Sequence, residues 1–526
     1  MKKRISILLL IFVMAVSAVG WFYVVYAGNE KENESGLSIF FNPQMRRFVQ
    51  IMKIIEESYY RDISEEEMVN AAIKGMLKDL DPHSVYIHKD NDLENFNMST
   101  SGKFGGIGFR VGIRDDMITV ISPIENTPAS RAGIRAGDII MKIDTVSAEG
   151  MDINEAVSLM RGEPGTDVTL KINRFGDTIN FNIERAIINI RPIPYYGMID
   201  DSTGYIKVLQ FSDNLSSEFA DAMDELFYKN NATRLILDLR SNPGGLLNEA
   251  INISDFFLPK GLEVVSTQSR NEAMEMSFKA TKPIYKGFFP LVILVDHGSA
   301  SASEIVAGAV QDWDRGVVMG DTTYGKGSVQ SVYDFEKYGE DMRGILKFTT
   351  ARYFTPSGRS IDRELIKYEE TDPDTIHYQS LGGLERSLSG NGGIIPDYVF
   401  QERRITPVEI KMLQEQTAFV FAAKYIDSNK PGSEFAFSIP ESVIEQYFDY
   451  VRDRDIDIDE LLSDSELKAD AILQLKLEFA RQLGGDELFY RIMTRENYLI
   501  RKSRQLLKNS PDTETMLQRI EEMTKN

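Results

Sequence analysis

The sequence predicts a multidomain α/β protein in which helical segments flank a β-rich unit and a layered core. Three observations carry this prediction. The chain has 526 residues, more than one hydrophobic core usually organises. From residue 205 onward short apolar strands alternate with helical patterns, whereas residues 96–188 combine strand patterns with many glycines. The charged residues after about 401 follow mostly helical patterns.

Composition excludes several classes of function. The chain carries 59 Lys plus Arg against 80 Asp plus Glu, which gives a net charge of -21. Such acidity repels phosphate backbones, so the sequence argues against a nucleic-acid partner. There is no cysteine, which excludes disulfides, thiolate zinc sites, a cysteine nucleophile and a lipid-bearing N-terminal cysteine.

The amino terminus predicts a location in the cell envelope. Met1-Lys2-Lys3-Arg4 precedes 23 uncharged residues, 5–27, a length that can span a bilayer. Basic residues ahead of such a span stay in the cytoplasm, so the rest of the chain is expected outside it, in the periplasm or anchored to the inner membrane. Val25-Tyr26-Ala27 also fits cleavage of a signal peptide. Both interpretations stay open, and the length of the apolar run favours the anchor.

Two helices are expected in the segment that follows, residues 28–95. Apolar residues recur at helical spacing over residues 43–60 and again over residues 65–80. The second pattern ends at Asp81-Pro82-His83-Ser84, where proline stops a helix. His83 fits a structural turn better than a catalytic role, because a lone histidine is a weak motif.

Residues 96–188 form a compact β-rich pattern with a glycine-rich start. The run from Gly105 through Gly106, Ile107 and Gly108 to Phe109 precedes a strand pattern at 117–121, a helix pattern at 153–160 and a strand pattern at 167–173. This order resembles a PDZ domain of the bacterial protease type. Free amides beside a strand edge hold a terminal carboxylate while a peptide adds as a strand. We therefore expect Gly106 to Phe109 to bind the tail of a peptide substrate.

A tight turn follows the strand pattern at 235–239. It reads Arg240-Ser241-Asn242-Pro243-Gly244-Gly245 and leads into a helical pattern. Turns of this kind expose backbone N–H groups, and two such groups aimed at one point stabilise an oxyanion. Gly244 and Gly245 are both candidates for such a donor.

A serine-rich run follows the strand pattern at 291–295. Asp296-His297-Gly298 leads into Ser299-Ala300-Ser301-Ala302-Ser303-Glu304 and then into a helical apolar pattern. This order places a small hydroxyl at a helix N-terminus, where the dipole and free amides favour negative charge. It suits a serine nucleophile with the Ala302 amide as half of an oxyanion hole. A serine followed three residues later by glutamate is equally an ordinary capping box, so the run alone leaves both interpretations open.

The choice depends on a base for the serine. Of the four histidines, His83, His88, His297 and His377, only His297 is local, and it precedes Ser301 by four residues across a sharp turn. A Ser–Lys pair is the alternative. Lysine acts as a base near neutral pH only when it is buried away from carboxylates. Lys326, between Gly325 and Gly327, is the candidate.

Gln330 is the predicted partner of this lysine. If residues 326–330 are extended, Lys326, Ser328 and Gln330 fall on one face of the strand. The Gln330 amide would then orient the amine without adding charge. A carboxylate at this position would keep the lysine protonated.

The same stretch also resembles a phosphate-binding loop. Gly320, Gly325 and Lys326 match that pattern, but its last position should be Ser or Thr and is Gly327. The residues that follow predict a strand instead of the helix that would bind phosphates. Nucleotide binding is therefore disfavoured.

Taken together, the motifs resemble the carboxy-terminal processing peptidases, the tail-specific protease family. The matching segments occur in family order over residues 45–400. They are Asp81-Pro82-His83-Ser84, the PDZ segments, Asp238 to Gly245, Ser299 to Glu304, Tyr324 to Gln330, Tyr353 to Ser360 and Gly393-Ile394-Ile395-Pro396-Asp397.

This resemblance implies a crotonase-like (ClpP/crotonase type) α/β protease core over residues 189–400, with the PDZ domain at 96–188. It implies Ser301 as nucleophile, Lys326 as base, Gln330 as the lysine-orienting residue, and the amides of Gly244 and Ala302 as the oxyanion hole. It further implies a serine endopeptidase that recognises the C-terminal tails of protein substrates and cleaves near them by an acyl-enzyme mechanism, with no metal or organic cofactor.

Residues 401–526 lie outside the resemblance. Their helical patterns, clearest at 407–425 and 467–483, are expected to form an extension that serves a homo-oligomer, an adaptor or substrate confinement. The competing function is an inactive PDZ scaffold that captures tails without cleaving them. The presence of Ser301, Lys326 and Gln330 argues against that alternative.

Overall fold

The computed structural model describes residues 42–525 except 89, 339–343, 364–376, 391 and 401–402. These residues form two compact units, which are divided in sequence between Tyr86 and Ile87. The predicted anchor or signal segment, residues 1–27, lies outside the described residues. No helix within the described ranges is both long and apolar enough to cross a membrane.

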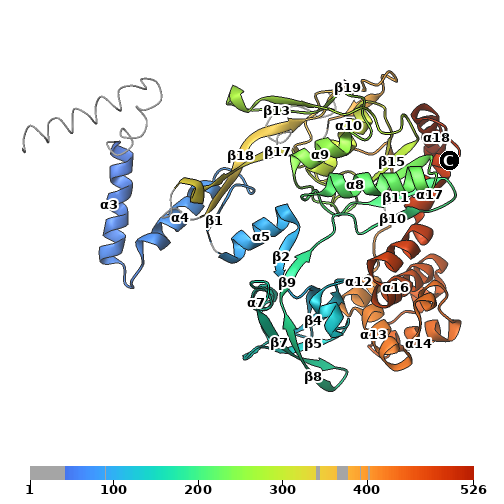
Figure 1. Cartoon of the computed structure of the whole chain (residues 1–526), viewed down its shortest axis with the longest axis horizontal. Coiled ribbons are helices and arrows are strands. Elements are labelled where there is room, and N and C mark those ends of the chain that lie inside the picture. Colours follow the sequence, from blue (N-terminus) through green and yellow to red (C-terminus); the bar gives the residue numbers. More distant parts are fainter. Residues whose placement is uncertain are drawn as a thin grey trace, which may run out of the picture. The chain divides into compact units, whose positions relative to one another are not determined.

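The first unit contains the two helices predicted near the amino terminus (Figure 1). They are α3 (Pro43–Ser58) and α4 (Glu65–Lys78). Ser64 and Glu67 form a capping box that fixes the start of α4. In the turn that follows, the Asp81 carboxylate accepts from the backbone amide of His83 at 2.7 Å, and β1 (Val85–Ile87) comes next. The turn that contains His83 is thus held by Asp81.

The second unit begins with α5 (Asp90–Ser101) and a β-rich portion. Its sheet has the order β3-β4-β5-β7-β8 with antiparallel neighbours, and it leaves β3 at one edge. Buried Val120, Ile140 and Leu170 belong to the cluster beneath it. The bounds of the elements in this portion are β2 (Lys103–Gly106), β3 (Phe109–Arg114), β4 (Met117–Pro123), α6 (Pro128–Ala132), β5 (Ile139–Ile143), β6 (Val146–Ser147), α7 (Ile153–Met160), β7 (Asp167–Arg174), β8 (Asp177–Glu184) and β9 (Ala186–Asn189).

A six-stranded sheet forms the centre of the second unit, in the order β10-β11-β12-β15-β16-β21. All neighbours are parallel except the first pair. The strands are short, and the four inner ones are almost wholly buried, as expected for a parallel sheet covered on both faces. They are β10 (Tyr195–Met198), β11 (Thr203–Lys207), β12 (Arg234–Asp238), β15 (Leu291–Val295), β16 (Val317–Gly320) and β21 (Tyr398–Val399).

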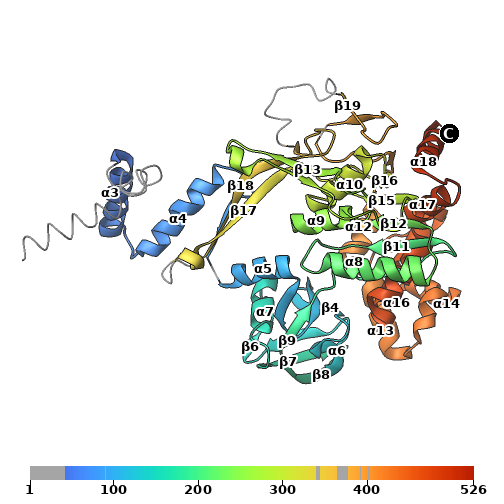
Figure 2. The ribbon, with the colours of Figure 1, turned by 45° about the horizontal axis from the view of Figure 1, so that its top comes forward.

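Helices from two parts of the chain cover this sheet (Figure 2). On one face Leu237 and Ile293 pack with α8 (Leu215–Asp224), α9 (Leu247–Ser254) and α10 (Ala302–Asp312). On the other face the alternate residues Ile236 and Val292 pack with α17 (Tyr498–Lys508) and α18 (Thr513–Lys525). The carboxyl-terminal helices therefore complete the core of the sheet. A π-helical turn, Glu225–Lys229, follows α8.

A second sheet contains the long hairpin β17 (Ser328–Asp334) and β18 (Ile345–Phe354), followed by β13 (Glu263–Gln268) and β14 (Met276–Lys279). The short strands β19 (His377–Gln379) and β20 (Ser387–Ser389) pair with each other. Short 3-10 turns lie at Glu272–Met274, Phe335–Tyr338 and Ser433–Phe437.

The helical extension differs from the sequence prediction in two places. Residues 407–425 form two helices, α12 (Pro407–Gln414) and α13 (Thr417–Asn429), because Gln416 adopts a left-handed conformation between them. The pattern at 467–483 belongs to the longer α16 (Ser465–Glu496), which is kinked at Gly484 and Gly485. The other helices are α14 (Glu441–Arg452) and α15 (Asp459–Ser463).

The packing of α17 on the sheet can be tested with Leu507→Ala. Leu507 is fully buried in the sheet cluster, so we expect the free energy of unfolding to fall by about 3 kcal/mol. Urea unfolding followed by the fluorescence of Trp313, which packs on the same core sheet, measures this change. Leu413→Ala is the matched control, because Leu413 is 56% exposed and should change stability by less than about 0.5 kcal/mol. Equal effects of the two substitutions would refute a structural role for α17.

Candidate active site

The serine-rich turn lies between a buried strand and a buried helix. β15 ends at Val295, and α10 begins at Ala302 directly after Ser301. Ser301 has φ 53° and ψ -111°, a conformation that non-glycine residues adopt only where the surrounding structure imposes it. The predicted strand, turn and helix are therefore present, with Ser301 immediately before the helix.

The three serines of this turn have different environments. Ser299 Oγ donates to the Leu239 carbonyl and Ser303 Oγ donates to the Asn242 carbonyl, each at 2.9 Å. Ser299 and Ser303 are fully buried, whereas Ser301 is half-buried. The outer two serines hold neighbouring turns together, and Ser301 is the most accessible of the three.

The turn at residues 240–245, called the glycine turn here, packs directly against Ser301. The Asn242 carbonyl accepts from the backbone amide of Ala300 at 3.0 Å. Gly244 has φ 95°, and a side chain there would meet the Ala300 carbonyl oxygen at 2.6 Å and the Ala302 nitrogen at 2.8 Å. Only glycine fits so close an approach in this conformation. The structure therefore brings Gly244 and Ala302 together beside Ser301.

The two glycines of this turn have different contacts. The Gly244 amide donates to Asn242 Oδ1 at 2.9 Å. Gly245 forms a parallel bridge with Phe211, and a side chain at Gly245 would meet the Phe211 carbonyl oxygen at 2.2 Å. The Gly244 amide is therefore engaged by the Asn242 side chain of its own turn.

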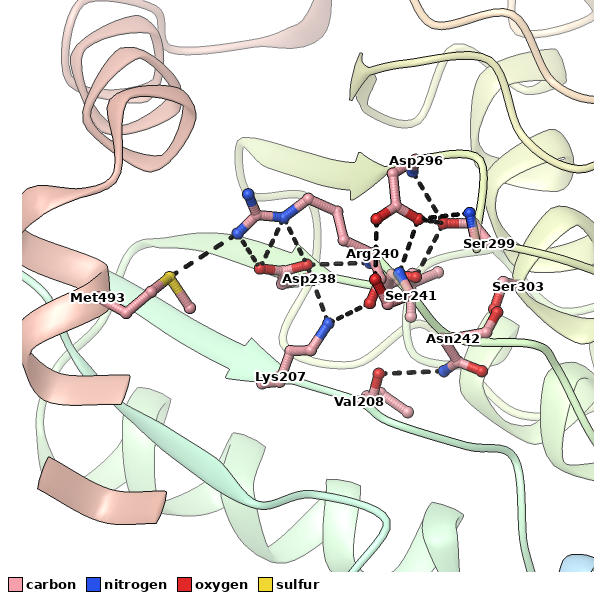
Figure 3. Close-up of polar contacts among 12 residues, drawn as sticks. Lys207, Val208, Asp238, Arg240, Ser241, Asn242, Asp296, Ser299, Ser303 and Met493 are labelled. Atoms are coloured by element: carbon pink, nitrogen blue, oxygen red, sulfur yellow. Dashed lines mark hydrogen bonds and ion pairs between the residues drawn. The ribbon is translucent and has the colours of Figure 1, made fainter. Parts of the chain in front are cut away.

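A carboxylate ties the two turns together. Asp296 Oδ1 accepts from the amide of Ser241 at 2.7 Å and from the amide of Gly298 at 2.9 Å. Asp296 Oδ2 accepts from Ser241 Oγ at 3.0 Å. Ser241 has φ 56°, so the bonds to Asp296 also hold a backbone conformation that is unusual for serine. Figure 3 shows these contacts.

A buried ionic cluster lies beneath the glycine turn (Figure 3). Asp238, fully buried, accepts from Tyr205 at 2.8 Å, pairs with Lys207 at 3.3 Å and pairs with Arg240 at 2.5 Å. Burial alone would raise the pKa of Asp238, but the cations of Arg240 and Lys207 and these hydrogen bonds hold it well below its ordinary value. Lys207 Nζ also donates to the Arg240 carbonyl, so the cluster fixes the start of the turn.

Arg240 also contacts the carboxyl-terminal helices. Its Nη1 lies 3.4 Å from Asn497 Oδ1, and its Nη2 lies 4.0 Å from Met493 Sδ. The pKa of Arg240 is raised, because the charge of Asp238 outweighs the effect of burial. The carboxyl-terminal extension therefore contacts Arg240, whose ion pair with Asp238 holds the start of the glycine turn.

The buried carboxylate of Glu304 links the serine-rich turn to the segment that carries Lys326. Glu304 Oε2 accepts from the amides of Ser301 and Lys326 at 2.7 and 2.9 Å. Glu304 Oε1 accepts from Thr323 Oγ1 at 2.6 Å and from the Gly325 amide at 2.7 Å. Burial raises the pKa of Glu304, and the four donors act against that rise.

The backbones of Ser301 and Lys326 lie close together. Because both of their amides bond to the same oxygen atom of Glu304, their backbone nitrogens lie within about 6 Å of each other. Lys326 is half-buried. Two residues that are 25 positions apart in the sequence thus meet at one carboxylate.

Gln330 lies near the start of β17. Its Nε2 donates to Ser328 Oγ at 3.0 Å, so Ser328 and Gln330 share one face of the strand. β17 begins at Ser328, so Lys326 precedes the strand. A strand, and not a helix, follows the stretch that resembles a phosphate-binding loop, and such a loop would lack its helix N-terminus.

The side chain of His297 contacts Asp321. Its Nε2 lies 3.1 Å from Asp321 Oδ2, and its side chain is 67% exposed. His297 is thus engaged by Asp321 at the surface, and its catalytic role stays a matter of prediction.

The segment that follows β18 braces the far end of α10. Arg359 is buried and donates to Asp312, and the amide of Ser357 donates to the same carboxylate at 2.8 Å. Arg359 also donates to Gln311 Oε1 at 3.0 Å. The contact of Ser357 is made by its backbone, which supports a structural role for this segment.

The β-rich portion contains a groove of about 1110 Å³ between β3 and α7. Gly106, Ile107, Gly108 and Phe109, the predicted tail-binding residues, all line it. β3 is the free edge of its sheet, so an added peptide strand has backbone partners there. The structure thus places these residues in one groove.

Two contacts that hold the site together were not predicted from the sequence. Glu304 was interpreted as a helix cap only, although its second pair of donors comes from Thr323 and Gly325. The contact of Arg240 with Asn497 joins residues 257 positions apart, and no local pattern signals it.

Comparisons with known proteins agree with this architecture. A model described as peptidase family S41 matches residues 202–375, and a PDZ domain model matches residues 119–174. A model described as the N-terminal domain of the activating protease CtpB matches residues 22–91.

Curated relatives match over most of their own length. The carboxy-terminal-processing protease of Bartonella bacilliformis is 42% identical over 323 residues, which cover 60% of this chain and 72% of the relative. The carboxy-terminal processing protease CtpA of Bacillus subtilis is 38% identical, covering 60% and 66%. A probable CtpA-like serine protease of Staphylococcus aureus is 35% identical over 382 residues, covering 72% and 73%. The chain therefore belongs to the carboxy-terminal processing proteases, which are serine-type peptidases of family S41.

Proposed function

We propose that this chain is an endopeptidase that binds the C-terminal tail of a protein substrate in its PDZ groove and cleaves near that tail, with Ser301 as nucleophile and Lys326 as base. The observation that carries the proposal is the single carboxylate of Glu304, which joins the backbone of Ser301 to that of Lys326. A serine and a lysine that are fixed so close together suit a Ser–Lys mechanism.

In the proposed reaction Ser301 Oγ attacks the carbonyl carbon of the scissile bond while Lys326 Nζ takes its proton. The oxyanion of the tetrahedral intermediate binds the amides of Ala302 and Gly244, the latter released by Asn242. Collapse breaks the C–N bond, and the leaving amine takes the proton from Lys326. Water then attacks the ester carbonyl while Lys326 Nζ takes its proton, and that proton passes to Ser301 Oγ as the ester C–O bond breaks.

Gln330 has a supporting role in this proposal. Its Nε2 is engaged with Ser328, which leaves its carbonyl oxygen as a neutral acceptor for the lysine amine. A neutral acceptor orients the amine without raising its pKa as a carboxylate would.

Tail binding is proposed for Gly106 to Phe109. In this arrangement the substrate adds as a strand to β3, and its terminal carboxylate binds the amides of the glycine-rich loop. We further propose that the reaction takes place outside the cytoplasm, because residues 5–27 suit a membrane anchor or a signal peptide.

The domain bounds are part of the same proposal. We place the PDZ domain at 96–188 and the protease core at 189–400, and we propose a crotonase-like arrangement for the latter. The parallel sheet with helices on both faces supports this assignment. The extension after 401 then contributes to the core through α17 and α18.

The first test is cleavage of a folded reporter with an apolar C-terminal tail. The unmodified chain should cut the reporter, and Ser301→Ala and Lys326→Ala should each reduce the rate by at least about 1000-fold. Gel shift and mass spectrometry of the products measure the rate and the cleavage position. A reporter with an amidated C-terminus is the control for tail recognition, because it lacks the terminal carboxylate.

Two outcomes would contradict the proposal. Binding of the tail without cleavage by the unmodified chain would make the protein a tail-capturing scaffold. Cleavage that survives Ser301→Ala would require another nucleophile.

A second test concerns Glu304→Gln. Glutamine keeps the size of the side chain but has one acceptor oxygen, so buried donors from Ser301, Gly325 and Lys326 cannot all be satisfied. We expect the free energy of unfolding to fall by about 2–4 kcal/mol, with kcat/KM per folded molecule at least about 100-fold lower. Urea unfolding and peptide hydrolysis measure the two quantities.

Glu249→Gln is the matched control. Glu249 accepts from Ser216 N at 2.6 Å and from Ser216 Oγ at 3.3 Å, at the start of α8. Its replacement should lower stability and leave hydrolysis per folded molecule unchanged. If both glutamine variants retain the same activity, Glu304 does not position the catalytic pair.

A further inference from the structure

Helix α17 carries apolar and basic residues on opposite sides. Leu506 and Leu507 are buried against the central sheet. The charged residues of the helix are all basic, since its sequence YLIRKSRQLLK contains no aspartate or glutamate. They are exposed or half-buried. The helix therefore presents a purely basic side to solvent.

Two hollows lie along this side of α17. The larger, of about 690 Å³, is lined by the four basic residues of the helix and by Asp200, between β10 and β11. The smaller, of about 230 Å³, lies between α17 and α18 and is lined by Lys502, Arg519 and Glu522. Lys502 lines both hollows, so the two adjoin. The cations of both hollows, called the basic face here, are Arg501, Lys502, Arg504, Lys508 and Arg519.

The cations of the basic face lack carboxylate partners. Within the described ranges, no ion pair and no side-chain hydrogen bond joins any of the five to another residue. Lys502 Nζ lies over the ring of Tyr498, 5.5 Å from its centre, and Arg504 acts on Asp200 through its charge alone. By contrast, Arg174 and Arg386 each form an ion pair with a buried aspartate. The basic face thus has positive charge that the chain itself leaves uncompensated.

This arrangement is unfavourable without a partner. Arg501 and Arg504 are three residues apart on the helix, and Arg504 and Lys508 are four apart, so like charges are neighbours. Such neighbours destabilise a helix. The chain as a whole has 80 Asp plus Glu against 59 Lys plus Arg, so the basic face has the opposite sign to the net charge of -21. Charge complementarity therefore points to an anionic partner.

The spread of the cations indicates what kind of anion fits. A helix rises about 1.5 Å per residue, so Arg501 and Lys508 are separated by about 10 Å along the axis of α17. A single phosphate binds donors that converge on one point, whereas this row suits a surface that carries many anionic groups. Tyr498, 43% exposed, stacks on Phe400 at 5.0 Å beside the row. An aromatic ring with a polar tip is typical of the boundary between lipid and water.

We propose that the basic face docks the catalytic unit on an anionic lipid surface. Arg501, Arg504 and Lys508 bind headgroup phosphates, and Tyr498 lies at the level of the headgroups. Residues 5–27, proposed above as an anchor or signal peptide, bring the chain to a membrane. When they remain as an anchor, docking takes place within one tethered molecule, so a weak attraction is sufficient. This inference uses the proposed location and goes beyond the proposed cleavage reaction.

The acidity of the rest of the chain does not prevent docking. At physiological ionic strength, exposed charges more than about 8 Å from each other are largely screened, so only the groups nearest the lipid contribute. At about 1 M salt the screening length falls to about 3 Å, so docking should be lost.

The first experiment uses the absence of cysteine to place one fluorescent label on the full chain. Gln505→Cys puts the label on the basic face, since Gln505 is exposed and lines both hollows. Ser217→Cys is the matched control, because Ser217 is exposed on α8, which covers the opposite face of the central sheet. Each chain is reconstituted with vesicles of phosphatidylcholine, or of equal parts phosphatidylcholine and phosphatidylglycerol. Both kinds of vesicle contain a lipid with a quencher on its headgroup.

The quenched fraction of the label gives the ratio of docked to undocked chains. For the label at position 505 we expect this ratio to be about 10- to 100-fold higher with phosphatidylglycerol than without it. About 1 M salt should abolish the difference. The label at position 217 should respond equally to the two kinds of vesicle. The inference is wrong if position 505 does not distinguish them, or if position 217 responds as strongly as position 505.

The second experiment removes three charges from the basic face. Each basic residue near an anionic surface strengthens binding by about fivefold, so Arg501→Gln, Arg504→Gln and Lys508→Gln combined should lower the ratio about 10- to 100-fold. Circular dichroism and urea unfolding verify that the variant is folded. Lys508→Gln alone should lower the ratio by about fivefold, which keeps the test decisive if the combined variant does not fold.

A matched control removes the same charge from another surface. Lys260, Lys279 and Lys282 are exposed and lie outside both hollows. Replacing all three with glutamine should leave docking unchanged. If this control loses docking as much as the α17 variant does, the overall charge and not the basic face is responsible, and the inference is refuted.

Other anions are tested on the same label. The chain labelled at position 505, kept in an uncharged detergent, is titrated with decaglutamate and with inorganic phosphate at physiological salt. Neither should give a saturable change in fluorescence. A saturable response to decaglutamate would make an acidic polypeptide the occupant of the basic face, and a saturable response to phosphate would make it a phosphate site. Either result would overturn the assignment to lipid.

Docking is measured without hydrolysis, so its failure is distinguishable from failure of the proposed function. The combined α17 variant should cut a soluble reporter at the rate of the unmodified chain, because its three positions lie outside the proposed catalytic and tail-binding residues. If the unmodified chain does not cut the reporter, the proposed function fails while the docking result stands. If it cuts the reporter and position 505 does not respond to phosphatidylglycerol, only docking is refuted.

Discussion

The active site depends on the buried carboxylate of Glu304. It accepts four hydrogen bonds, and its donors come from Ser301 at the start of α10 and from Thr323, Gly325 and Lys326 in the segment before β17. A buried carboxylate is costly unless its oxygens are satisfied, so the fold holds both segments close to it. The separation of Ser301 and Lys326 is therefore set by backbone contacts, which are stiffer than contacts between long side chains.

Polar contacts to backbone groups also hold the glycine turn against the serine-rich turn, on the other side of Ser301. Asp296 binds the amide of Ser241, and the carbonyl of Asn242 binds both Ala300 and Ser303. Two turns that are far apart in sequence thereby share one set of polar contacts. Their strained residues, Ser241 and Ser301, both have positive φ, and the contacts around them stabilise these conformations.

The carboxyl-terminal extension belongs to the protease core. α17 and α18 cover one face of the central sheet, and without them apolar residues such as Ile236 and Val292 would face solvent. The extension also reaches Arg240 beneath the glycine turn. A segment outside the matching motifs thus contacts a residue that holds the glycine turn.

Local pattern was sufficient for several parts of this protein. The helix Ile153–Met160 and the strand Leu291–Val295 have the predicted bounds, because their apolar periods and capping residues are local properties. The break at Gln416 was missed, since nothing in the pattern over 407–425 marks a left-handed residue. The family motifs similarly pointed to Ser301, Lys326 and the glycine turn from sequence order alone.

The sequence by itself determined the element types, the family and the residues that are candidates for chemistry, because these depend on short-range pattern and motif order. Only the tertiary structure decided how these residues meet. It assigned Glu304 to four donors, engaged the Gly244 amide with Asn242 and placed Asn497 beside Arg240. Such contacts join segments whose separation along the chain carries no periodic signal, and they form only when the sheet and its two helical layers pack together.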